Sequence, residues 1–279
     1  MASFLALFSS LLWGGADFFG GNLTKRYKAL AVTAVSQSFG LLFGLITILL
    51  ATAWLQPTLS WSNYFLPGVF AGILGFTGLT AFYAGLATGR MGVVSPISSL
   101  SVLIPLTIAF INGEKPTTVQ LIGMAVALTG AFCASGPELS QGLSPKPLFL
   151  ALGAAAGFGT ALTFMSIGSE SSALMTMVMM RATTFIFTIS LVIKFRSVGN
   201  FEKSEFPILI FIGVSDFLAN LLLGAATNFG LVSLVMVLGS LYPVVTALLA
   251  FKFLNERLHR VQYVGIVLAV AGVALIAAS

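Results

Sequence analysis

The sequence predicts an all-α integral membrane protein with ten transmembrane helices arranged as two inverted five-helix repeats. Hydrophobic residues make up 58% of its 279 residues and charged residues only 8%. A water-soluble domain of this size needs a far more charged surface, so this composition excludes a soluble fold. Apolar stretches of about 20 residues, each long enough to cross a bilayer, recur along the chain. The third observation is an internal duplication.

The duplication is clearest at the end of each half. Segment 92–109 recurs in segment 230–247 at a constant shift of 138, and 114–130 recurs in 256–272 at a shift of 142. The difference between the two shifts is about one helical turn, which lengthens a helix without rotating its faces far. The first shift relates Gly92, Val94, Ser95, Leu100, Leu103, Pro105 and Ala109 to Gly230, Val232, Ser233, Leu238, Leu241, Pro243 and Ala247. An internally duplicated, nearly uncharged chain is typical of a secondary transporter.

The apolar stretches define the expected spans in order along the chain. Only helices are expected, because a backbone exposed to hydrocarbon must satisfy its own polar groups. The first stretch is interpreted as a retained span, since no basic residue precedes Lys25 and a secretory signal begins with basic residues. We place the spans at 3–22, 30–54, 64–88, 93–111, 117–135, 147–167, 173–195, 206–228, 231–253 and 260–278.

The first and sixth spans begin the two repeats. Phe4-Leu5-Ala6-Leu7 recurs as Phe149-Leu150-Ala151-Leu152, and Trp13-Gly14 aligns with Phe158-Gly159. Segment 136–146, between the fifth and sixth spans, contains glycines and prolines that interrupt helices. It is the predicted linker between the first repeat, residues 1–135, and the second repeat, residues 147–279.

The basic residues predict how the spans are oriented. Connections one, three, five, seven and nine contain eleven Lys and Arg residues, whereas the other side contains only Lys115. By the positive-inside rule, the odd-numbered loops are cytoplasmic and both termini lie outside. With five spans in each repeat, the second copy enters the membrane upside down. We therefore expect a multi-pass protein of the plasma (inner) membrane. The eleven residues are Lys25, Arg26, Lys28, Arg90, Lys146, Lys194, Arg196, Lys203, Lys252, Arg257 and Arg260.

Several motifs resemble one transporter family. The segment Leu254-Asn255-Glu256-Arg257-Leu258, followed by Gln262, Gly265 and Gly272, is similar to the end of an EamA domain of the drug/metabolite transporter superfamily. Leu12-Trp13-Gly14, the junction 89–96 and Ser240-Leu241-Tyr242-Pro243 are also similar to bacterial members. The resemblance covers the whole chain as two EamA repeats. It implies ten helices in two antiparallel halves and export or permeation of small metabolites such as amino acids. Many members place their termini in the cytoplasm, whereas the charges of this chain predict the opposite.

Three charged residues lie well inside the expected spans, away from their ends: Asp17, Arg181 and Asp216. Each costs about 2.5 kcal/mol or more in hydrocarbon, so each should face the helix bundle interior. Arg181 and Asp216 lie at similar depth on consecutive antiparallel spans. Two interpretations are open for Arg181: it binds a substrate carboxylate, or it forms a buried ion pair with Asp216. The ion pair is favoured, because a buried charge seeks its nearest partner.

Two polar stripes are candidate cavity walls. Asp216 and Asn220 are one helical turn apart, and Asp17 shares a face with small residues of the first span. Each stripe predicts either a cavity wall or a close helix–helix contact. Burial favours the protonated form of a carboxyl group, which suits a proton carrier. Asp17 and Asp216 are therefore the proton-coupling candidates.

Equivalent prolines, Pro105 and Pro243, predict helix breaks in the fourth and ninth spans. Matching breaks in two repeats indicate a binding site, although a static kink that only shapes packing is the alternative. Aromatic and hydroxyl side chains near the breaks and on other spans are expected to line the cavity, or else to pack or anchor at the interface. These further candidates are Trp13, Gln37, Tyr83, Ser98, Ser101, Ser240 and Tyr242.

Other features predict structural roles. Glu114 and the matching Glu256 precede helices and are interpreted as helix caps. Small-residue runs at 123–131 and 265–269 pack helices either within one chain or between two chains. The single cysteine, Cys133, permits no disulfide framework or cysteine metal site. No metal or cofactor is expected.

These observations favour a secondary active transporter that exports small metabolites such as neutral or aromatic amino acids. Alternating access around a midplane cavity between the repeats, with proton coupling, is the expected mechanism. An uncoupled permease or channel, and a membrane protein without transport activity, are the alternatives; an enzyme is not favoured. The expected partners are a small-molecule substrate and the lipid bilayer, with no nucleic acid. The oligomeric state is left open and includes a monomer.

Overall fold

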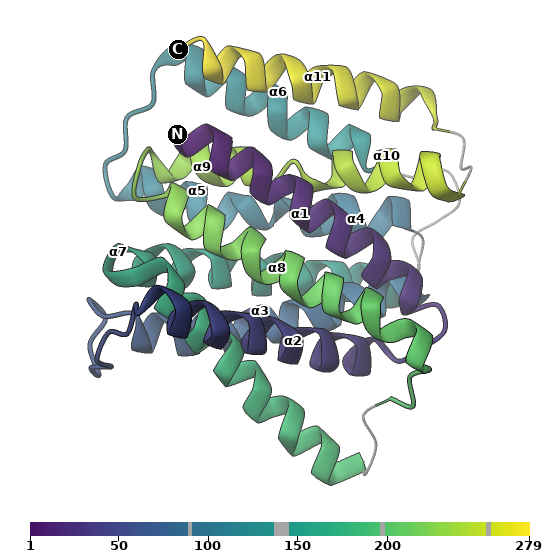
Figure 1. Cartoon of the computed structure of the whole chain (residues 1–279). Helices are drawn as coiled ribbons and strands as arrows, with labels where there is room; N and C mark the ends of the chain where they lie inside the picture. Colours follow the sequence, from purple (N-terminus) through teal and green to yellow (C-terminus); the bar gives the residue numbers. More distant parts are fainter. Residues whose placement is uncertain (89–90, 137–144, 196–198, 255–257) are drawn as a thin grey trace.

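The computed structural model of the chain describes residues 1–88, 91–136, 145–195, 199–254 and 258–279 (Figure 1). Within these ranges every regular element is a helix. The elements are α1 (Ala2–Leu23), α2 (Ala29–Ala51), α3 (Phe65–Thr88), α4 (Met91–Ser99), η1 (Leu100–Val102), α5 (Leu103–Ile111), α6 (Thr118–Ala134), α7 (Pro145–Phe195), η2 (Lys203–Glu205), α8 (Phe206–Ala226), α9 (Val232–Gly239), α10 (Tyr242–Leu254) and α11 (Arg260–Ala277). Most of the predicted linker, together with Arg90, Arg196, Glu256 and Arg257, lies outside the described residues.

The helices have the length and composition of membrane spans. Eight of the helical segments in the described ranges are long and apolar enough to cross a bilayer, and α6 is a shorter apolar helix of 17 residues. Large apolar side chains cover the outside of the bundle, including Leu50 (82% exposed) and Phe149 (72% exposed). Such a surface is stable in contact with lipid and would aggregate in water. The prediction of an all-helical, multi-pass membrane protein is confirmed.

Helix α7 contains two of the expected spans. It is continuous by hydrogen bonding over 51 residues, but Ser172 has extended backbone angles (φ −165°, ψ 111°) that kink the chain. The hydroxyl oxygen of Ser172 accepts a hydrogen bond from the backbone N–H of Met175 at 3.2 Å, as an N-cap serine does. The expected spans 147–167 and 173–195 lie on the two sides of this kink.

Two of the expected spans are interrupted. Helices α4 and α5 are joined by the 3₁₀ turn η1, and Ser240 and Leu241 separate α9 from α10. Each interruption lies just before a proline, Pro105 in one case and Pro243 in the other. Proline has no N–H to donate to the carbonyl four residues earlier, so the regular helix is weakened at that point.

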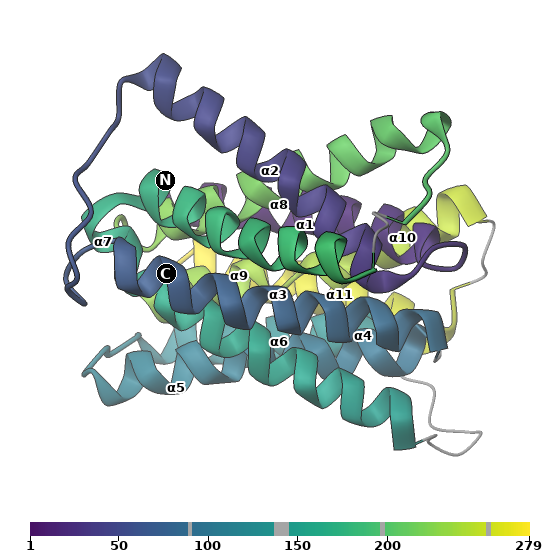
Figure 2. The ribbon, with the colours of Figure 1, turned by 90° about the horizontal axis from the view of Figure 1, so that it is seen from below.

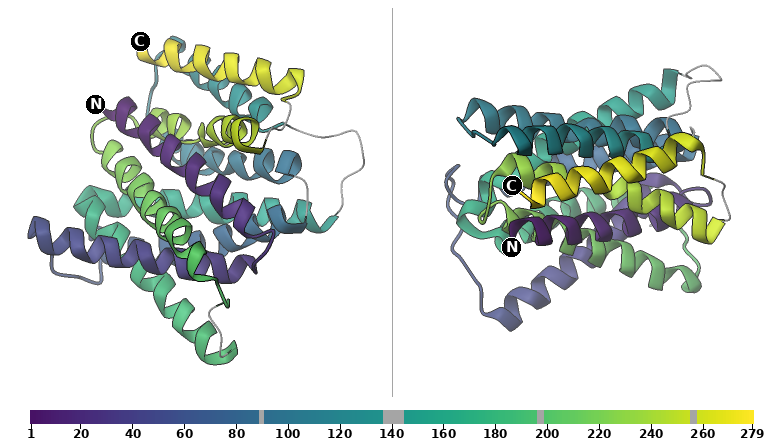
Figure 3. Two further views of the ribbon diagram at one scale, coloured as in Figure 1. Left: turned by 45° about the vertical axis from the view of Figure 1, so that its right-hand side comes forward. Right: turned by 90° about the horizontal axis from the view of Figure 1, so that it is seen from above.

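Helices α6 and α11 pack against each other along one edge of the bundle (Figures 1 and 3). The contact is backbone to backbone, because a Cβ atom added to Gly130 would lie 2.7 Å from Cα of Ala269. Gly265 is equally close to Ala134, and Gly272 to Ala127. The small-residue runs therefore pack two helices of the same chain against each other.

The remaining helices surround the centre of the bundle. Helix α3 packs along α7, and α8 packs against α1 and α2 (Figure 2). Both chain termini lie at one end of the bundle, and the C-terminal ends of α1, α3, α6 and α10 lie at the other (Figure 1). At that second end the Nη1 atom of Arg26 lies 2.7 Å from a carboxylate oxygen of Glu205.

Candidate functional site

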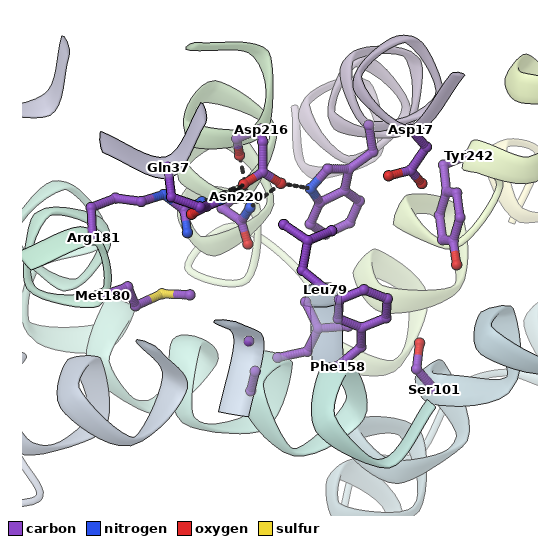
Figure 4. Close-up of a pocket in the computed structure, with 14 residues that line it drawn as sticks. Asp17, Gln37, Leu79, Ser101, Phe158, Met180, Arg181, Asp216, Asn220 and Tyr242 are labelled. Atoms are coloured by element: carbon purple, nitrogen blue, oxygen red, sulfur yellow. Dashed lines mark hydrogen bonds and ion pairs between the residues drawn. The ribbon is translucent and has the colours of Figure 1, made fainter. Parts of the chain in front are cut away.

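A cavity lies in the middle of the bundle, enclosed by α1, α2, α3, η1, α7, α8 and α10 (Figure 4). Its volume is about 80 Å³. At ~10–15 Å³ for each water molecule, it holds roughly five to eight water-sized groups. It is therefore large enough for a small metabolite. The lining residues are Trp13, Asp17, Gln37, Gly75, Leu79, Ser101, Phe158, Ala161, Leu162, Met180, Arg181, Asp216, Asn220 and Tyr242.

Helical periodicity explains how four helices contribute to the lining. Residues four apart on a helix lie on the same face, one turn above the other. Helices α1, α3, α7 and α8 each present such a pair to the cavity. The pairs are Trp13 and Asp17, Gly75 and Leu79, Phe158 and Leu162, and Asp216 and Asn220.

The Asp216 carboxylate accepts four side-chain hydrogen bonds. Its Oδ2 atom accepts from Nη2 of Arg181 at 2.8 Å and from Nε2 of Gln37 at 2.7 Å. Its Oδ1 atom accepts from Nε1 of Trp13 at 3.0 Å and from Nδ2 of Asn220 at 3.2 Å. All four donors belong to side chains of the cavity wall, so they fix the orientation of the Asp216 carboxylate.

Arg181 is paired with this anion. Its side chain is 5% exposed and that of Asp216 is 13% exposed, so the ion pair is shielded from water. The buried Nε atom of Arg181 has no hydrogen-bond partner among the described residues. The guanidinium carries five N–H groups, so it keeps donor capacity beyond the ion pair. Its charge, however, is already neutralised by Asp216.

Asp17 lies apart from Asp216 in the cavity lining, next to Tyr242 (Figure 4). Within the described part of the chain, its carboxylate has no hydrogen-bond or ion-pair partner. The hydroxyl of Tyr242 is also buried without a partner among those residues. The indole of Trp13 donates to Asp216 and contacts the ring of Tyr242 edge-on, with centroids 6.3 Å apart. The cavity thus contains one compensated and one uncompensated carboxylate.

The structure places eight of the eleven expected cavity residues in the lining. Three lie outside it. Tyr83 is buried against Gly20, and the buried Ser98 lines no part of the cavity. The hydroxyl of Ser240, which follows α9, donates to the carbonyl of Val237 in the last turn of that helix at 2.7 Å. Pro105 and Pro243 are also absent from the lining. Pro243 directly follows the lining residue Tyr242, and Pro105 lies four residues after the lining residue Ser101.

The apolar wall of the cavity was missed from the sequence. It consists of glycine, alanine and large apolar side chains that look like ordinary span residues. One signal was available, because the repeat alignment pairs Trp13 with Phe158. Extending that alignment by one turn pairs Asp17 with Leu162. The missed residues are Gly75, Leu79, Phe158, Ala161, Leu162 and Met180.

Glu114 caps a different helix from the one expected. The sequence predicts that it caps the helix that follows it, α6. Helix α6 instead begins with a capping box made by Thr117 and Gln120. The carboxylate of Glu114 accepts hydrogen bonds from the backbone N–H groups of Val232 at 2.7 Å and Ser233 at 3.0 Å. It therefore joins the α5–α6 connection to the start of α9.

The fold and the cavity together define a multi-pass membrane protein with a polar site buried at its centre. The sequence matches the EamA-like transporter family over residues 1–136 and 145–278. The chain belongs to this family, and the family indicates a membrane transporter of small molecules.

Two further similarities describe the chain. An uncharacterized protein of Methanocaldococcus jannaschii is 27% identical over 132 residues, which are 47% of this chain and 96% of that protein. A protein of known crystal structure has the same fold with a TM-score of 0.76. The match covers 98% of this chain and 95% of the other, at 17% sequence identity.

Proposed function

We propose that this protein is a secondary active transporter that exports small amphiphilic metabolites, such as neutral or aromatic amino acids, by proton-coupled alternating access. The observation that carries the proposal is the central cavity, which has a polar wall and an apolar wall. Direction rests on the family expectation of export.

The contributions to the cavity support two repeats of five spans, residues 1–135 and 147–279. With shifts of 145, 144 and 141 for the first, second and third spans, five pairs of cavity-lining residues fall at equivalent positions of the two halves. Both repeats thus contribute equivalent faces to a single site, as alternating access between two halves requires. The pairs are Trp13 with Phe158, Asp17 with Leu162, Gln37 with Arg181, Gly75 with Asp216, and Leu79 with Asn220.

Helix packing supports the same ten-span arrangement. A Cβ atom on Gly72 would lie 2.6 Å from the carbonyl oxygen of Met180, and one on Gly213 would overlap the carbonyl oxygen of Ser36. The same shifts of 141 and 144 pair Gly72 with Gly213 and Ser36 with Met180. The same close helix crossing therefore occurs twice. The relative from M. jannaschii, which is about half as long as this chain, is consistent with one repeat as a separate unit.

The distribution of basic residues supports a plasma-membrane protein with the odd-numbered connections in the cytoplasm. The helix ends that flank these connections lie together at one end of the bundle, and both termini lie at the other (Figure 1). Arg26 of the first connection and Glu205 of the seventh form an ion pair at the proposed cytoplasmic end.

The two walls support an amphiphilic substrate. Trp13, Gln37, Asn220 and the charged residues form the polar wall, whereas α3 and α7 contribute mainly apolar side chains. An amino acid fits this division, with its charged groups on the polar wall and its side chain on the apolar wall. The cavity volume of about 80 Å³ favours compact substrates, and a larger aromatic side chain requires the apolar wall to open.

Uptake into proteoliposomes tests the proposal. The purified protein is reconstituted and offered labelled neutral, aromatic and basic amino acids, with and without an imposed proton gradient. We expect saturable uptake of one class that increases with the gradient. Saturable uptake that is indifferent to the gradient would remove proton coupling, and saturable uptake of none of the panel would refute the proposed substrate class.

A further inference from the structure

We infer that Asp17 binds the protonated amine of the substrate and exchanges this ammonium group for a proton, so that the amine, and not the carboxylate, is the group the cavity requires. This inference rests on the proposed transport function and names the chemistry of its site. It makes simple alkylamines ligands of the same cavity as amino acids.

The charges that line the cavity lead to this conclusion. Asp17, Arg181 and Asp216 are the charged residues of the lining. Arg181 and Asp216 neutralise each other at 2.8 Å, so the ionised cavity has a net charge of about −1. A single uncompensated charge in a water-poor site strongly favours an ion of opposite sign. The complementary group is an ammonium ion or a proton.

Asp216 is not available for either ion. All four of its hydrogen bonds come from side chains of the wall itself. Turning it toward a ligand would break these bonds and leave Arg181 buried without its counter-ion, which is unfavourable. Asp17 has no such partner within the described residues, so an ammonium or a proton can bind there without breaking an existing bond.

The same charges disfavour a required carboxylate. The positive charge of Arg181 is already used, so a substrate carboxylate would add a second negative charge to a cavity that has an excess of one. The carboxylate of an amino acid is tolerated only because its ammonium group binds Asp17. Removing the amine from a substrate should therefore abolish binding, whereas removing the carboxylate should not.

The surroundings of Asp17 fit a small primary amine. Leu162, Phe158 and Leu79 provide an apolar surface in the same cavity for the carbon chain. The unpartnered hydroxyl of Tyr242 is a further hydrogen-bond acceptor in the same cavity.

Few other ionisable groups lie on the helices that pack against α1. Helix α8 contributes Asp216, α3 contributes Tyr83, and α10 contributes Tyr242 near the cavity and Lys252 in its last turn. Helix α9 contains no ionisable side chain. Asp17 is thus the group in this region whose charge changes most directly with proton or amine binding.

Exchange follows from mutual exclusion. One carboxylate holds either a proton or an ammonium ion, so one proton enters on Asp17 for each ammonium that leaves. For an alkylamine this exchange moves no net charge across the membrane. No covalent bond is formed or broken apart from the bond to the transferred proton.

Binding of three related compounds to the purified full-length protein in detergent tests the inference. Valine carries both groups, isobutylamine lacks the carboxylate, and 3-methylbutanoate lacks the amine. Isothermal titration calorimetry in two buffers of different ionisation enthalpy reports affinity and the protons released for each ligand bound. We expect valine and isobutylamine to bind, each displacing up to one proton, and 3-methylbutanoate not to compete.

Variants separate the role of Asp17 from a structural one. Asp17→Asn should weaken isobutylamine binding at least about tenfold and remove proton release, because the amide keeps the shape and loses the charge. Asp17→Glu should retain both. Asp17→Leu combined with Leu162→Asp moves the carboxylate to the equivalent position of the other repeat and should restore amine binding in part. The melting temperature of each variant in detergent checks that it is folded.

Three results would overturn the inference. These are wild-type affinity and proton release in folded Asp17→Asn, competition by 3-methylbutanoate as strong as that by isobutylamine, and no binding of any of the three compounds. If amino-acid uptake by proteoliposomes persists in that last case, the proposed function survives. If uptake is also absent, both proposals fail.

Discussion

Replacing Asp216 by asparagine tests whether the ion pair of the cavity wall is structural. The substitution keeps the shape of the side chain but removes the counter-ion of Arg181, whose side chain is 5% exposed. The amide also presents one NH₂ group where four donors now meet an acceptor. Breaking a buried pair in this way costs about 3–5 kcal/mol. We expect Asp216→Asn to lower the free energy of unfolding by that amount.

The double variant Arg181→Met, Asp216→Asn provides the matched control. Removing both charges leaves no buried ion unpaired, and the asparagine can still bond to Gln37, Trp13 and Asn220. Replacing both members of a buried pair is often nearly neutral, so the double variant should recover most of the lost stability. The two single losses should therefore exceed the double loss by about 2 kcal/mol or more.

Unfolding by SDS titration in mixed micelles, followed by circular dichroism, measures all four proteins of this cycle. A loss below about 1 kcal/mol in Asp216→Asn would refute the reasoning, because the charge would then be solvated or unimportant. Additive losses would refute it as well, since they would mean that the two side chains act independently.

Three further predictions concern other parts of the molecule. Gly130→Ala should destabilise the fold by about 1–3 kcal/mol, because its Cβ would lie 2.7 Å from Cα of Ala269. Gly153 has open space around it, so Gly153→Ala should be neutral or stabilising by about 0.5–1 kcal/mol. The same SDS titration compares the two variants. Glu114→Gln should lower the unfolding free energy by about 0.5–2 kcal/mol, with most of the loss disappearing in high salt if charge is responsible. Tyr242→Phe removes a buried hydroxyl that has no partner among the described residues. It should preserve the melting temperature and weaken isobutylamine binding severalfold. A fall in melting temperature without a change in affinity would contradict a role of this hydroxyl in ligand binding.

The class of fold was predictable because a bilayer restricts a chain more than water does. Length and hydrophobicity identify spans almost independently of their partners, so the expected ranges agree with the helices to within a few residues at most ends. One expected span continued to residue 54, whereas α2 ends at Ala51 and is followed by Thr52 with a positive φ of 48°. A boundary of this kind depends on local backbone geometry, and hydropathy does not report it.

The polar half of the candidate site was also predictable, and the apolar half was not. A charge in hydrocarbon is costly enough to imply an interior position, which is why Asp17, Arg181 and Asp216 could be singled out. Leu79, Leu162 and similar residues are equally stable facing lipid, another helix or a cavity. Which of these surfaces they face depends on the angles and contacts at which the helices cross, and these cannot be predicted from the hydrophobicity of a single sequence.

The capping role of Glu114 was assigned to the wrong helix for a related reason. A carboxylate near a helix start is favourable whichever helix it reaches, and local sequence suggests the nearest one. Thr117 already fills that role through its capping box with Gln120. The donors that Glu114 finds, at Val232 and Ser233, are more than one hundred residues away in the chain.

The pairing of α6 with α11 has a consequence for how the protein is made. Gly130 and Ala127 leave a groove along one face of α6, and in the described part of the chain this face packs against α11. During synthesis this groove therefore faces lipid until Arg260–Ala277 has been inserted, long after α6 itself has entered the membrane. A polypeptide that ends before residue 260 would carry an open, glycine-lined helix surface that can mispair with another nascent chain.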